Sequence, residues 1–352
     1  MSERKARKGR TRKVRYAVVG LGYVSQIALL PAFSHSREHS EVTALVSGDP
    51  IKLKSLARKY RIAHTYSYEQ YADCLASGNI DAGYIALPDH MHRAYAEPAA
   101  RAGIHILCEK PMAFEEAGCE AMIAEAEKAK VKLMIAYRLH FELGNLQAIQ
   151  VVNSGKIGEP RIFTSSFSQQ VRPGNSRLKK DLGGGPLYDL GVYRINAARY
   201  LFRAEPEQVF AWHSGGDGDR FREVPATTTA MLQFPGDRVA SFTCSFGAAD
   251  RSVFEVIGTK GVVRMDPAYE MVEALHRRSR STEKPPSRCF DGGTNLLLNW
   301  SISRVVFSTI RTRSPRVARV SPMSASFRLC YNRPRPIGRL RSGQLKSPVG
   351  PP

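Results

Sequence analysis

Near its N-terminus the chain reads Val14-Arg15-Tyr16-Ala17-Val18-Val19-Gly20-Leu21-Gly22-Tyr23-Val24-Ser25, and the helix-like segment Gln26–Phe33 follows. A short β-branched strand, a glycine turn and a helix in this order are the context in which a G-x-G-x-x-G pattern is informative. Gly20 permits the tight turn, and Gly22 lets the backbone approach a pyrophosphate at the helix N-terminus. Ser25 stands in the place of the third glycine and is still small. The first predicted cofactor-binding residues are therefore Gly20, Leu21, Gly22, Tyr23 and Val24.

The next predicted strand, Glu41–Val46, ends in Ser47-Gly48-Asp49-Pro50, with Lys52 just beyond. A site specific for NAD usually places an acid at this strand tip, where it binds the ribose 2′-hydroxyl. The tip residue here is Ser47, and a hydroxyl with the Lys52 ammonium suits a 2′-phosphate better. We therefore predict NADP, with NAD as the alternative, bound by Ser47, Gly48 and Lys52. Asp49 favours NAD unless it caps the helix that begins near Pro50.

Strands and helices alternate through the first 150 residues. Further strands are predicted at 82–87, 104–108 and 132–136, with helices near 91–102 and 115–130. This alternation is typical of a parallel doubly wound sheet, in which ligands bind beyond the carboxyl ends of the strands. We predict an α/β protein with an N-terminal Rossmann domain at 15–140, preceded by a basic disordered tail at 1–14.

A charged pair and a proline, Glu109-Lys110-Pro111, directly follow the apolar strand Ile104–Cys108. Proline ends the strand and restricts Lys110 to extended geometry, which holds its ammonium at the rim of the sheet. The alternative is a surface lysine at a strand end. Leu87 and Pro88 lie at another strand tip on the same rim as the glycine turn. Because three strand tips converge there, we predict that Lys110 is a site residue.

From about residue 157 the pattern changes to longer β-rich runs. These lie at 161–169, 208–213, 227–234, 238–246, 253–257 and 262–265, and most alternate apolar and polar residues. Such alternation indicates a sheet with one covered face. We predict a C-terminal α+β domain at 141–278 with a large, mostly antiparallel open sheet.

One helix, predicted at Asp189–Phe202, interrupts these strands and follows the run Gly183-Gly184-Gly185-Pro186. Asp189 and Tyr193 are four residues apart, so both project from one face near the helix start. With Lys110 opposite, they form a proton-transfer and hydroxyl-binding set, since a cation helps a phenol to release its proton. The alternative is an acid favoured by the helix dipole and a tyrosine at the domain seam.

The charge of the chain is confined to its ends. The 352 residues carry a formal charge of +20, of which residues 1–15 contribute +7 and residues 271–352 contribute +13. The segment 16–270 is therefore neutral. Basic tails bind phosphate non-specifically, but solvated, disordered ends are the better explanation of this charge. We expect no specific nucleic-acid partner.

No apolar run is long enough to span a bilayer, and the basic N-terminus leads into a segment too short for a signal peptide. The cysteines show no paired metal-ligand spacing, and several lie in apolar or helical contexts that suit reduced thiols. We expect a cytoplasmic protein without a membrane partner or a metal.

From about Arg15 to Glu270 the chain resembles the Gfo/Idh/MocA oxidoreductase family, and within it the glucose–fructose oxidoreductase branch. The resemblance rests on the motifs at Gly20, Ser47 and Lys110, and on two further segments. These are Ala136-Tyr137-Arg138-Leu139-His140-Phe141 and Gly183-Gly184-Gly185-Pro186-Leu187-Tyr188-Asp189-Leu190-Gly191-Val192-Tyr193.

The resemblance implies hydride transfer between nicotinamide and a sugar or polyol. It implies that Lys110 binds the substrate hydroxyl, that Tyr193 is the acid/base for the carbinol proton, and that Asp189 orients the sugar. Many relatives have histidine in the place of Tyr193, and tyrosine favours the glucose–fructose oxidoreductase branch. The remaining predicted cofactor contacts are Leu87, Pro88, His92, Glu109, Lys110 and Arg138. The family also implies a homo-oligomer, dimer or tetramer, built through the C-terminal sheet.

After about residue 278 the alternation disappears, and we predict an aberrant, basic, disordered tail at 279–352. Codons for Arg313–Phe327 exist that give EPSGREGLADVRIV when read two nucleotides later, and Gly292–Val305 likewise yields RDQPSPELVYFSRC. Both peptides resemble the C-terminal segment of the family. We hypothesise that the reading frame slips between about Met271 and Arg280. The alternative function is then a catalytically impaired or non-catalytic cofactor-binding protein.

The encoding DNA tests this hypothesis directly. We expect the codons for residues 292–327, read two nucleotides later, to give the two family-like peptides. Codons that are incompatible with those peptides would refute the frame slip.

Overall fold

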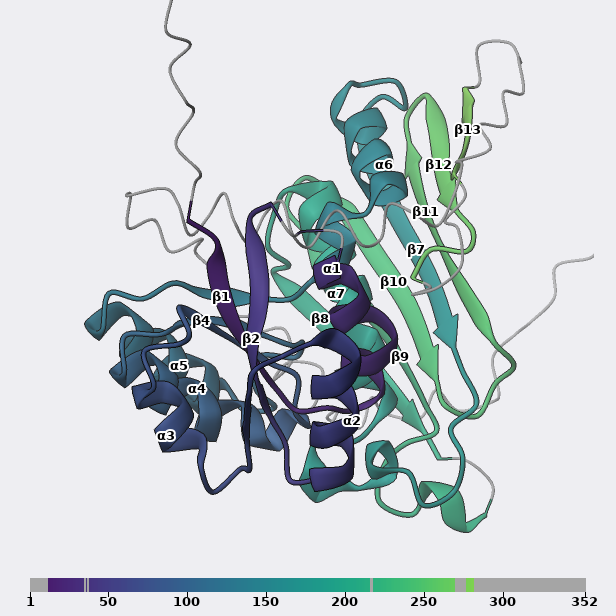
Figure 1. Cartoon of the computed structure of the whole chain (residues 1–352). Helices are drawn as coiled ribbons and strands as arrows, with labels where there is room; N and C mark the ends of the chain where they lie inside the picture. The colour runs from purple at the N-terminus through teal and green to yellow at the C-terminus, as the bar shows by residue number, and fades with distance from the viewer. Residues whose placement is uncertain (1–11, 35, 37, 216–217, 270–276, 282–352) are drawn as a thin grey trace, which may run out of the picture.

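The computed structural model describes residues 12–269, apart from 35, 37, 216 and 217, and the strand at 277–281 (Figure 1). The predicted tail at 279–352 lies outside the described residues except for the end of that strand, and so do the segments on which the frame hypothesis rests. Of the tail predicted at 1–14, the structure describes residues 12–14, and the first strand already begins at Val14.

The first sheet has six parallel strands in the order β3-β2-β1-β4-β5-β6. Their bounds are β1 Val14–Val19, β2 Ser40–Val46, β3 His64–Tyr66, β4 Ala82–Ile85, β5 His105–Cys108 and β6 Leu133–Ile135. The strand order reverses between β1 and β4, which confirms the predicted doubly wound Rossmann sheet. Ligands of such sheets bind in the crevice beyond the carboxyl ends of the strands at this reversal.

Helices cover both faces of this sheet (Figure 1). They are α1 Leu30–Ser34, α2 Pro50–Tyr60, α3 Tyr71–Ala76, α4 His92–Arg101 and α5 Glu116–Lys128. A π-helical turn, η1 (Ser25–Leu29), leads into α1. Alternate strand residues enter separate hydrophobic clusters on the two faces, for example Ala17 on one and Val18 on the other. The short β3 and α3 contain too few residues for a periodic pattern, which is why the sequence did not predict them.

The glycine turn after β1 needs glycine at its first position. Gly20 has φ +96°, and a Cβ there would lie 2.5 Å from the carbonyl oxygen of Ala86. Ser25 is buried, and its hydroxyl donates a 2.6 Å hydrogen bond to the Gly20 carbonyl. Ser25 therefore fastens the turn at the position where the third glycine is usual.

The second sheet has seven strands in the order β13-β12-β11-β7-β10-β9-β8. Their bounds are β7 Pro160–Ser168, β8 Gln208–Ser214, β9 Thr227–Phe234, β10 Arg238–Ser245, β11 Arg251–Gly258, β12 Gly261–Met265 and β13 Arg277–Ser281. Strands β7 and β10 pair in parallel, and the other pairings recorded for this sheet are antiparallel. The predicted mostly antiparallel sheet is confirmed, with β13 as an addition that runs past residue 278.

Two helices pack on one face of this sheet. Helix α6 (Leu143–Asn153), which the sequence analysis did not predict, contacts β12, and α7 (Val192–Phe202) contacts β7 and β10. Nine of the eleven residues of α7 are buried. The segment predicted as one helix from Asp189 is in fact a π-helical turn, η6 (Leu187–Gly191), that continues into α7. Gly191 ends this turn, and a Cβ there would lie 2.6 Å from the end of the Leu187 side chain.

Candidate active site at the domain seam

Lys110, Asp189 and Tyr193 meet between the two domains. The Lys110 ammonium donates to the Asp189 carboxylate oxygen Oδ1 and to the Asp189 backbone carbonyl, both at 3.0 Å. It also lies 4.8 Å from the centre of the Tyr193 ring, over the ring face. The structure thus brings together the three residues that were predicted to be catalytic.

Four contacts support the turn that carries Lys110. Glu109 accepts a 2.6 Å hydrogen bond from the Tyr84 hydroxyl of β4 and a 3.3 Å hydrogen bond from the Lys110 amide. His92, at the start of α4, is fully buried, and its ring nitrogens lie 2.9 Å from the carbonyl oxygens of Pro111 and Leu87. The end of β5 is therefore tied to β4 and to α4, which fixes where the lysine begins.

Asp189 is held from two further directions. Its second oxygen, Oδ2, lies 3.2 Å from the Arg177 guanidinium and accepts a 3.4 Å hydrogen bond from Gln169. Arg177 belongs to the short helix η4 (Ser176–Leu178). Burial opposes ionisation of this carboxyl, but Lys110 and Arg177 outweigh it and lower the pKa of Asp189. Asp189 is therefore an anion at neutral pH.

Lys110 remains a cation because its neighbours outweigh the effect of burial. Its side chain is 12% exposed, so burial disfavours the ammonium, but the surroundings provided by Tyr193 and Asp189 raise the pKa of Lys110 above its usual value. An ammonium has three donors. Two of them reach Asp189, and no further hydrogen-bond acceptor for the third is recorded among the described residues. One donor is thus left for a ligand at the rim.

The glycine turn presents an open surface for a dinucleotide. No described atom lies within 4 Å of the position that a Cβ of Gly22 would occupy. Tyr23 is 74% exposed, whereas the Leu21 side chain is buried in the core, so only the backbone of Leu21 is free to face a ligand. The empty space beside the Gly22 backbone would allow a pyrophosphate to approach the backbone closely.

At the tip of β2, Asp49 is the cap of α2. Its carboxylate accepts hydrogen bonds from the amides of Ile51 and Lys52 at 3.1 and 3.0 Å. The Lys52 ammonium lies 2.9 Å from the same carboxylate. The objection that Asp49 raises against NADP is thus weakened, because this acid already serves the helix N-terminus. Ser47 is buried, and its hydroxyl accepts from the Asp49 amide at 3.2 Å.

Two predicted cofactor contacts find other surroundings. The ring of His92 is enclosed by backbone carbonyls, so this residue supports the Lys110 turn rather than facing a cofactor. Arg138, in η3 (Arg138–Phe141), directs its guanidinium to the carbonyl oxygen of Tyr269, and its Nε and Nη1 atoms are buried without a recorded partner. Both residues closely follow a strand of the first sheet in the chain, but their contacts are made with residues that are distant in the sequence.

Arg177 and Gln169 are site residues that sequence reasoning did not find. Neither belongs to a motif: Gln169 follows the end of β7, and Arg177 lies in the loop before the glycine run. This loop returns to the site because Gly184 has no Cβ, which would otherwise lie 2.5 Å from the carbonyl oxygens of Arg177 and Lys179. The glycine run was the available signal, because it required a close backbone contact at that point.

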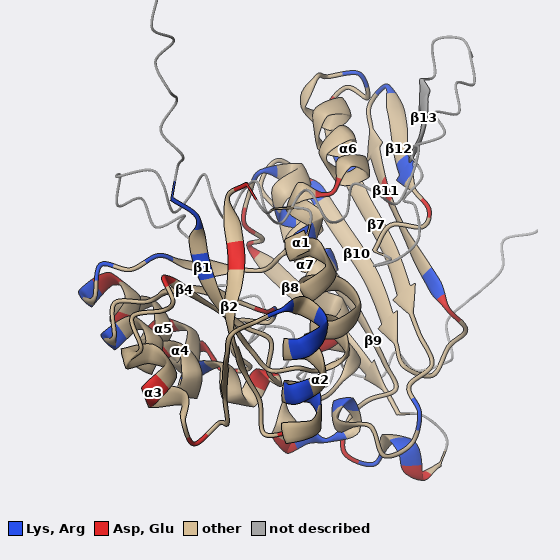
Figure 2. Ribbon diagram, viewed as in Figure 1, with Lys and Arg blue, Asp and Glu red and all other residues tan. Residues whose placement is uncertain are grey.

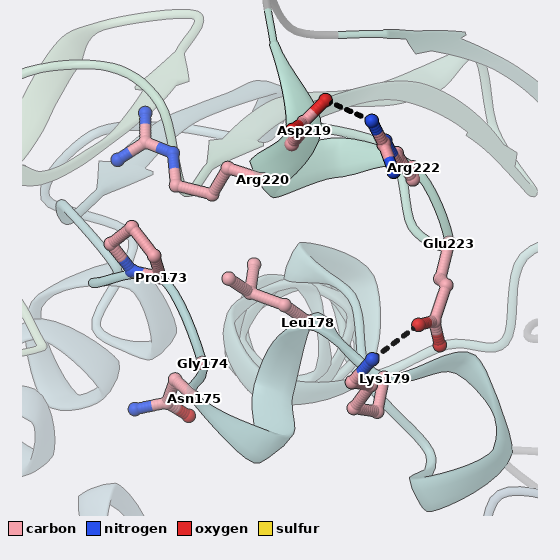
Figure 3. A pocket seen from close by; sticks show the side chains of 9 residues that line it. All are labelled: Pro173, Gly174, Asn175, Leu178, Lys179, Asp219, Arg220, Arg222 and Glu223. Carbon is pink, nitrogen blue, oxygen red and sulfur yellow. Dashed lines mark hydrogen bonds and ion pairs between the residues drawn. The ribbon is translucent and has the colours of Figure 1, made fainter.

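A pocket of about 660 Å³ lies between this loop, at residues 173–179, and residues 219–223 (Figure 3). Lys179 is paired with Glu223 at 2.6 Å, and Arg222 is paired with Asp219, across its mouth. The catalytic candidates are not part of its lining, which consists of Pro173, Gly174, Asn175, Leu178, Lys179, Asp219, Arg220, Arg222 and Glu223. Its charged groups are largely occupied by each other.

Within the described residues, no three His, Cys, Asp or Glu side chains are grouped as a metal site would require. No helix among them is long and apolar enough to cross a membrane. The described cysteines, Cys74, Cys108, Cys119 and Cys244, are free thiols.

A Rossmann sheet with an open glycine turn, beside a buried lysine, carboxylate and tyrosine, defines the class of the nicotinamide-dependent oxidoreductases. Residues 14–137 match the model of the oxidoreductase family with the NAD-binding Rossmann fold, and residues 145–264 match the GFO/IDH/MocA C-terminal domain. The chain belongs to the Gfo/Idh/MocA oxidoreductase family, as its sequence motifs indicated.

Individual relatives agree with this assignment. The chain is 35% identical to an uncharacterized oxidoreductase, ORF334, of Rhizobium meliloti over 268 residues, which are 75% of this chain and 78% of the relative. It is 34% identical to the D-xylose 1-dehydrogenase [NADP(+)] of Haloarcula marismortui, with 73% of each chain covered. The crystal structure of the aldose-aldose oxidoreductase from Caulobacter crescentus, complexed with glycerol, matches with a TM-score of 0.79 and 37% identity, covering 87% of this chain and 92% of that chain.

The Lys110–Asp189 pair generates a prediction on stability. Asp189→Asn leaves the buried ammonium without its carboxylate, so we expect a loss of about 3 kcal/mol in the free energy of unfolding at pH 7. The pKa of Asp189 is lower in the folded state than in the unfolded state, where it is about 3.9. The stability that the ion pair adds to the wild type is therefore complete above the unfolded-state pKa and is lost as the pH falls through the folded-state pKa. Urea unfolding at pH 7 and at pH 3 measures both parts.

The control is Asp73→Asn, which removes an exposed acid from α3. Equal losses at both pH values for Asp189→Asn, or a loss no larger than that of the control, would contradict the assigned ion pair.

Proposed function

We propose that this protein is an NADP-dependent oxidoreductase that transfers hydride between nicotinamide and a carbon of a sugar or polyol. The observation that carries the proposal is the buried Lys110–Asp189 pair against the Tyr193 ring, at the carboxyl rim of the Rossmann sheet. The cofactor, when bound, supplies the hydride chemistry, and the protein supplies position and charge. The sugar enzymes among the relatives support this substrate class.

Each of the three residues has a distinct task. The remaining donor of Lys110 binds the oxygen of the reacting carbinol and stabilises negative charge that develops there. Tyr193, whose ring lies against the ammonium, accepts or returns the proton of that oxygen. Asp189 keeps the ammonium in one orientation, and Arg177 in turn keeps Asp189 ionised.

The preference for NADP rests on the tip of β2. Helix α2 carries Lys52, Lys54, Arg58 and Lys59 and no acid (Figure 2). Asp49 is engaged as the cap of this helix, so a ribose 2′-phosphate would meet the Ser47 and Lys52 side chains rather than a free carboxylate. A named relative, the D-xylose 1-dehydrogenase [NADP(+)], uses the same cofactor.

The open face of the second sheet is suited to contact with a second copy of this protein. Phe210 of β8 and Met231 of β9 are directly opposite each other and are 43% and 50% exposed, and Trp212 beside them is 62% exposed. A contiguous apolar patch of this kind marks an interaction surface. We propose a homo-oligomer through this face, and a monomeric mass in light scattering at micromolar concentration would contradict it.

A second candidate is a catalytically impaired or non-catalytic cofactor-binding protein. The sequence after about residue 278 favours it, because that sequence departs from the family pattern. Comparison of the given chain with a frame-restored chain separates the candidates. Cofactor binding without oxidation of any sugar in both chains would favour the binder.

The proposed function predicts that the purified chain reduces NADP with at least one member of a panel of aldoses and polyols. Lys110→Ala removes the donor to the reacting oxygen, so we expect kcat to fall by about 100-fold or more. The variant should still bind NADPH, measured by fluorescence, which separates lost chemistry from lost folding. Unchanged turnover in the Lys110→Ala variant would overturn the site assignment.

The cofactor assignment predicts that Lys52→Ala lowers the ratio of kcat/KM for NADP over NAD by about 10-fold, as the loss of one charge-assisted contact implies. Lys59→Ala, at the far end of the same helix, is the matched control. Equal ratios in the wild type and in both variants would show that Lys52 does not bind the 2′-phosphate.

A further inference from the structure

A second carboxyl group faces the site from the other domain. Asp89 is the first residue of η2 (Asp89–Met91), in the segment that follows β4 at the rim of the Rossmann sheet. It meets the glycine run of the second domain, since a Cβ on Gly183 would lie 3.4 Å from the Asp89 Cβ and 3.5 Å from its carboxylate oxygen Oδ2. Gly183, at φ +76°, thus leaves room beside this carboxyl that another residue would fill.

Asp89 shares the electrostatic surroundings of the catalytic candidates. Burial raises the pKa of Asp89 to about 7, with the Asp189 anion acting in the same direction and the Lys110 and Arg177 cations opposing it. Asp89 follows β4 and Lys110 follows β5, and these two strands are parallel neighbours, so both residues lie at the same rim of the sheet. The Asp89 carboxylate is costly in the ligand-free site.

The carboxyl groups of Asp189 and Asp89 differ in the side-chain donors that contact them. Asp189 has donors from Lys110, Gln169 and Arg177. For Asp89, no hydrogen bond or ion pair from another side chain is recorded among the described residues. An ionised carboxyl can accept at about four lone-pair positions, and a partly buried one that lacks donors is stabilised when a ligand supplies them.

We propose that Asp89 is a specificity-determining residue that accepts a hydrogen bond from a hydroxyl of the sugar or polyol other than the one that reacts. The proposal rests on the proposed function. Lys110 and Tyr193 would bind the reacting oxygen, and Asp89, at the same rim and against Gly183, has acceptor capacity that no described side chain uses. A substrate with a hydroxyl near its reacting carbon supplies the missing donor, whereas a simple alcohol leaves the carboxylate unpaired.

The test uses the best substrate of the sugar panel and its monodeoxy derivatives, with the wild type, Asp89→Ala, Asp89→Asn and the control Asp73→Asn. We expect Asp89→Ala to raise the KM for the parent sugar by roughly 10- to 100-fold, the range for a lost hydrogen bond to a charged group. The kcat and the KM for NADP should stay within about threefold. Asp89→Asn retains one acceptor oxygen, so its KM for the parent sugar should lie between those of the wild type and Asp89→Ala.

The deoxy sugars identify the contact. The wild type should bind one deoxy derivative as weakly as Asp89→Ala binds the parent sugar. Asp89→Ala should bind that derivative and the parent sugar equally well. Quenching of protein-bound NADPH fluorescence by each sugar measures this binding without turnover. A purely structural role for Asp89 would instead weaken all sugars and NADPH alike and would overturn the proposal.

Two failures can be told apart. Wild-type protein that binds NADPH but neither binds nor oxidises any sugar or polyol would overturn the proposed function, and this proposal with it. Wild-type activity with a sugar preference that Asp89→Ala leaves unchanged would overturn this proposal alone.

Discussion

The ion pair between Lys110 and Asp189 is the contact on which the site depends. Its two residues are 79 positions apart in the chain and belong to different domains, and their side chains are 12% and 21% exposed. Charges that are this far from water persist only when each has its partner and its hydrogen bonds. The pair therefore requires that the two domains meet in one relative position at the rim.

The scaffold on the second-domain side is rigid because α7 is buried nearly all round. Tyr193 is in its first turn, and the next residue, Arg194, is also buried and places its guanidinium against the rings of Phe167 and Tyr269, which stack on each other. These rings lie on β7 and after β12, so the helix start is fixed against the sheet. A phenol held in this way keeps a constant distance from the lysine, and the advantage of such preorganisation is that no reordering is needed when a substrate binds.

The cofactor side and the substrate side are joined by one short stretch of backbone. Leu87 packs on Gly20 of the dinucleotide turn, its carbonyl oxygen contacts His92, and His92 in turn contacts Pro111 next to the lysine. One chain of contacts thus runs from the glycine turn to the residue next to Lys110. This arrangement explains why a buried histidine lies at a rim where exposed polar groups are usual.

Much of this protein was determined by local sequence. The glycine turn, the strands β1 and β9, and the Glu109-Lys110-Pro111 motif were recognised because each depends on residues that are adjacent in the chain. The tertiary structure alone decided that Arg177 and Gln169 reach Asp189, that Asp89 faces Gly183, that the His92 ring contacts two backbone carbonyls, and that Arg138 contacts Tyr269. These outcomes depend on how loops from distant segments close over one another. No periodicity or motif encodes such closure, since it results from packing between residues far apart in the chain, as many as 131 positions for Arg138 and Tyr269.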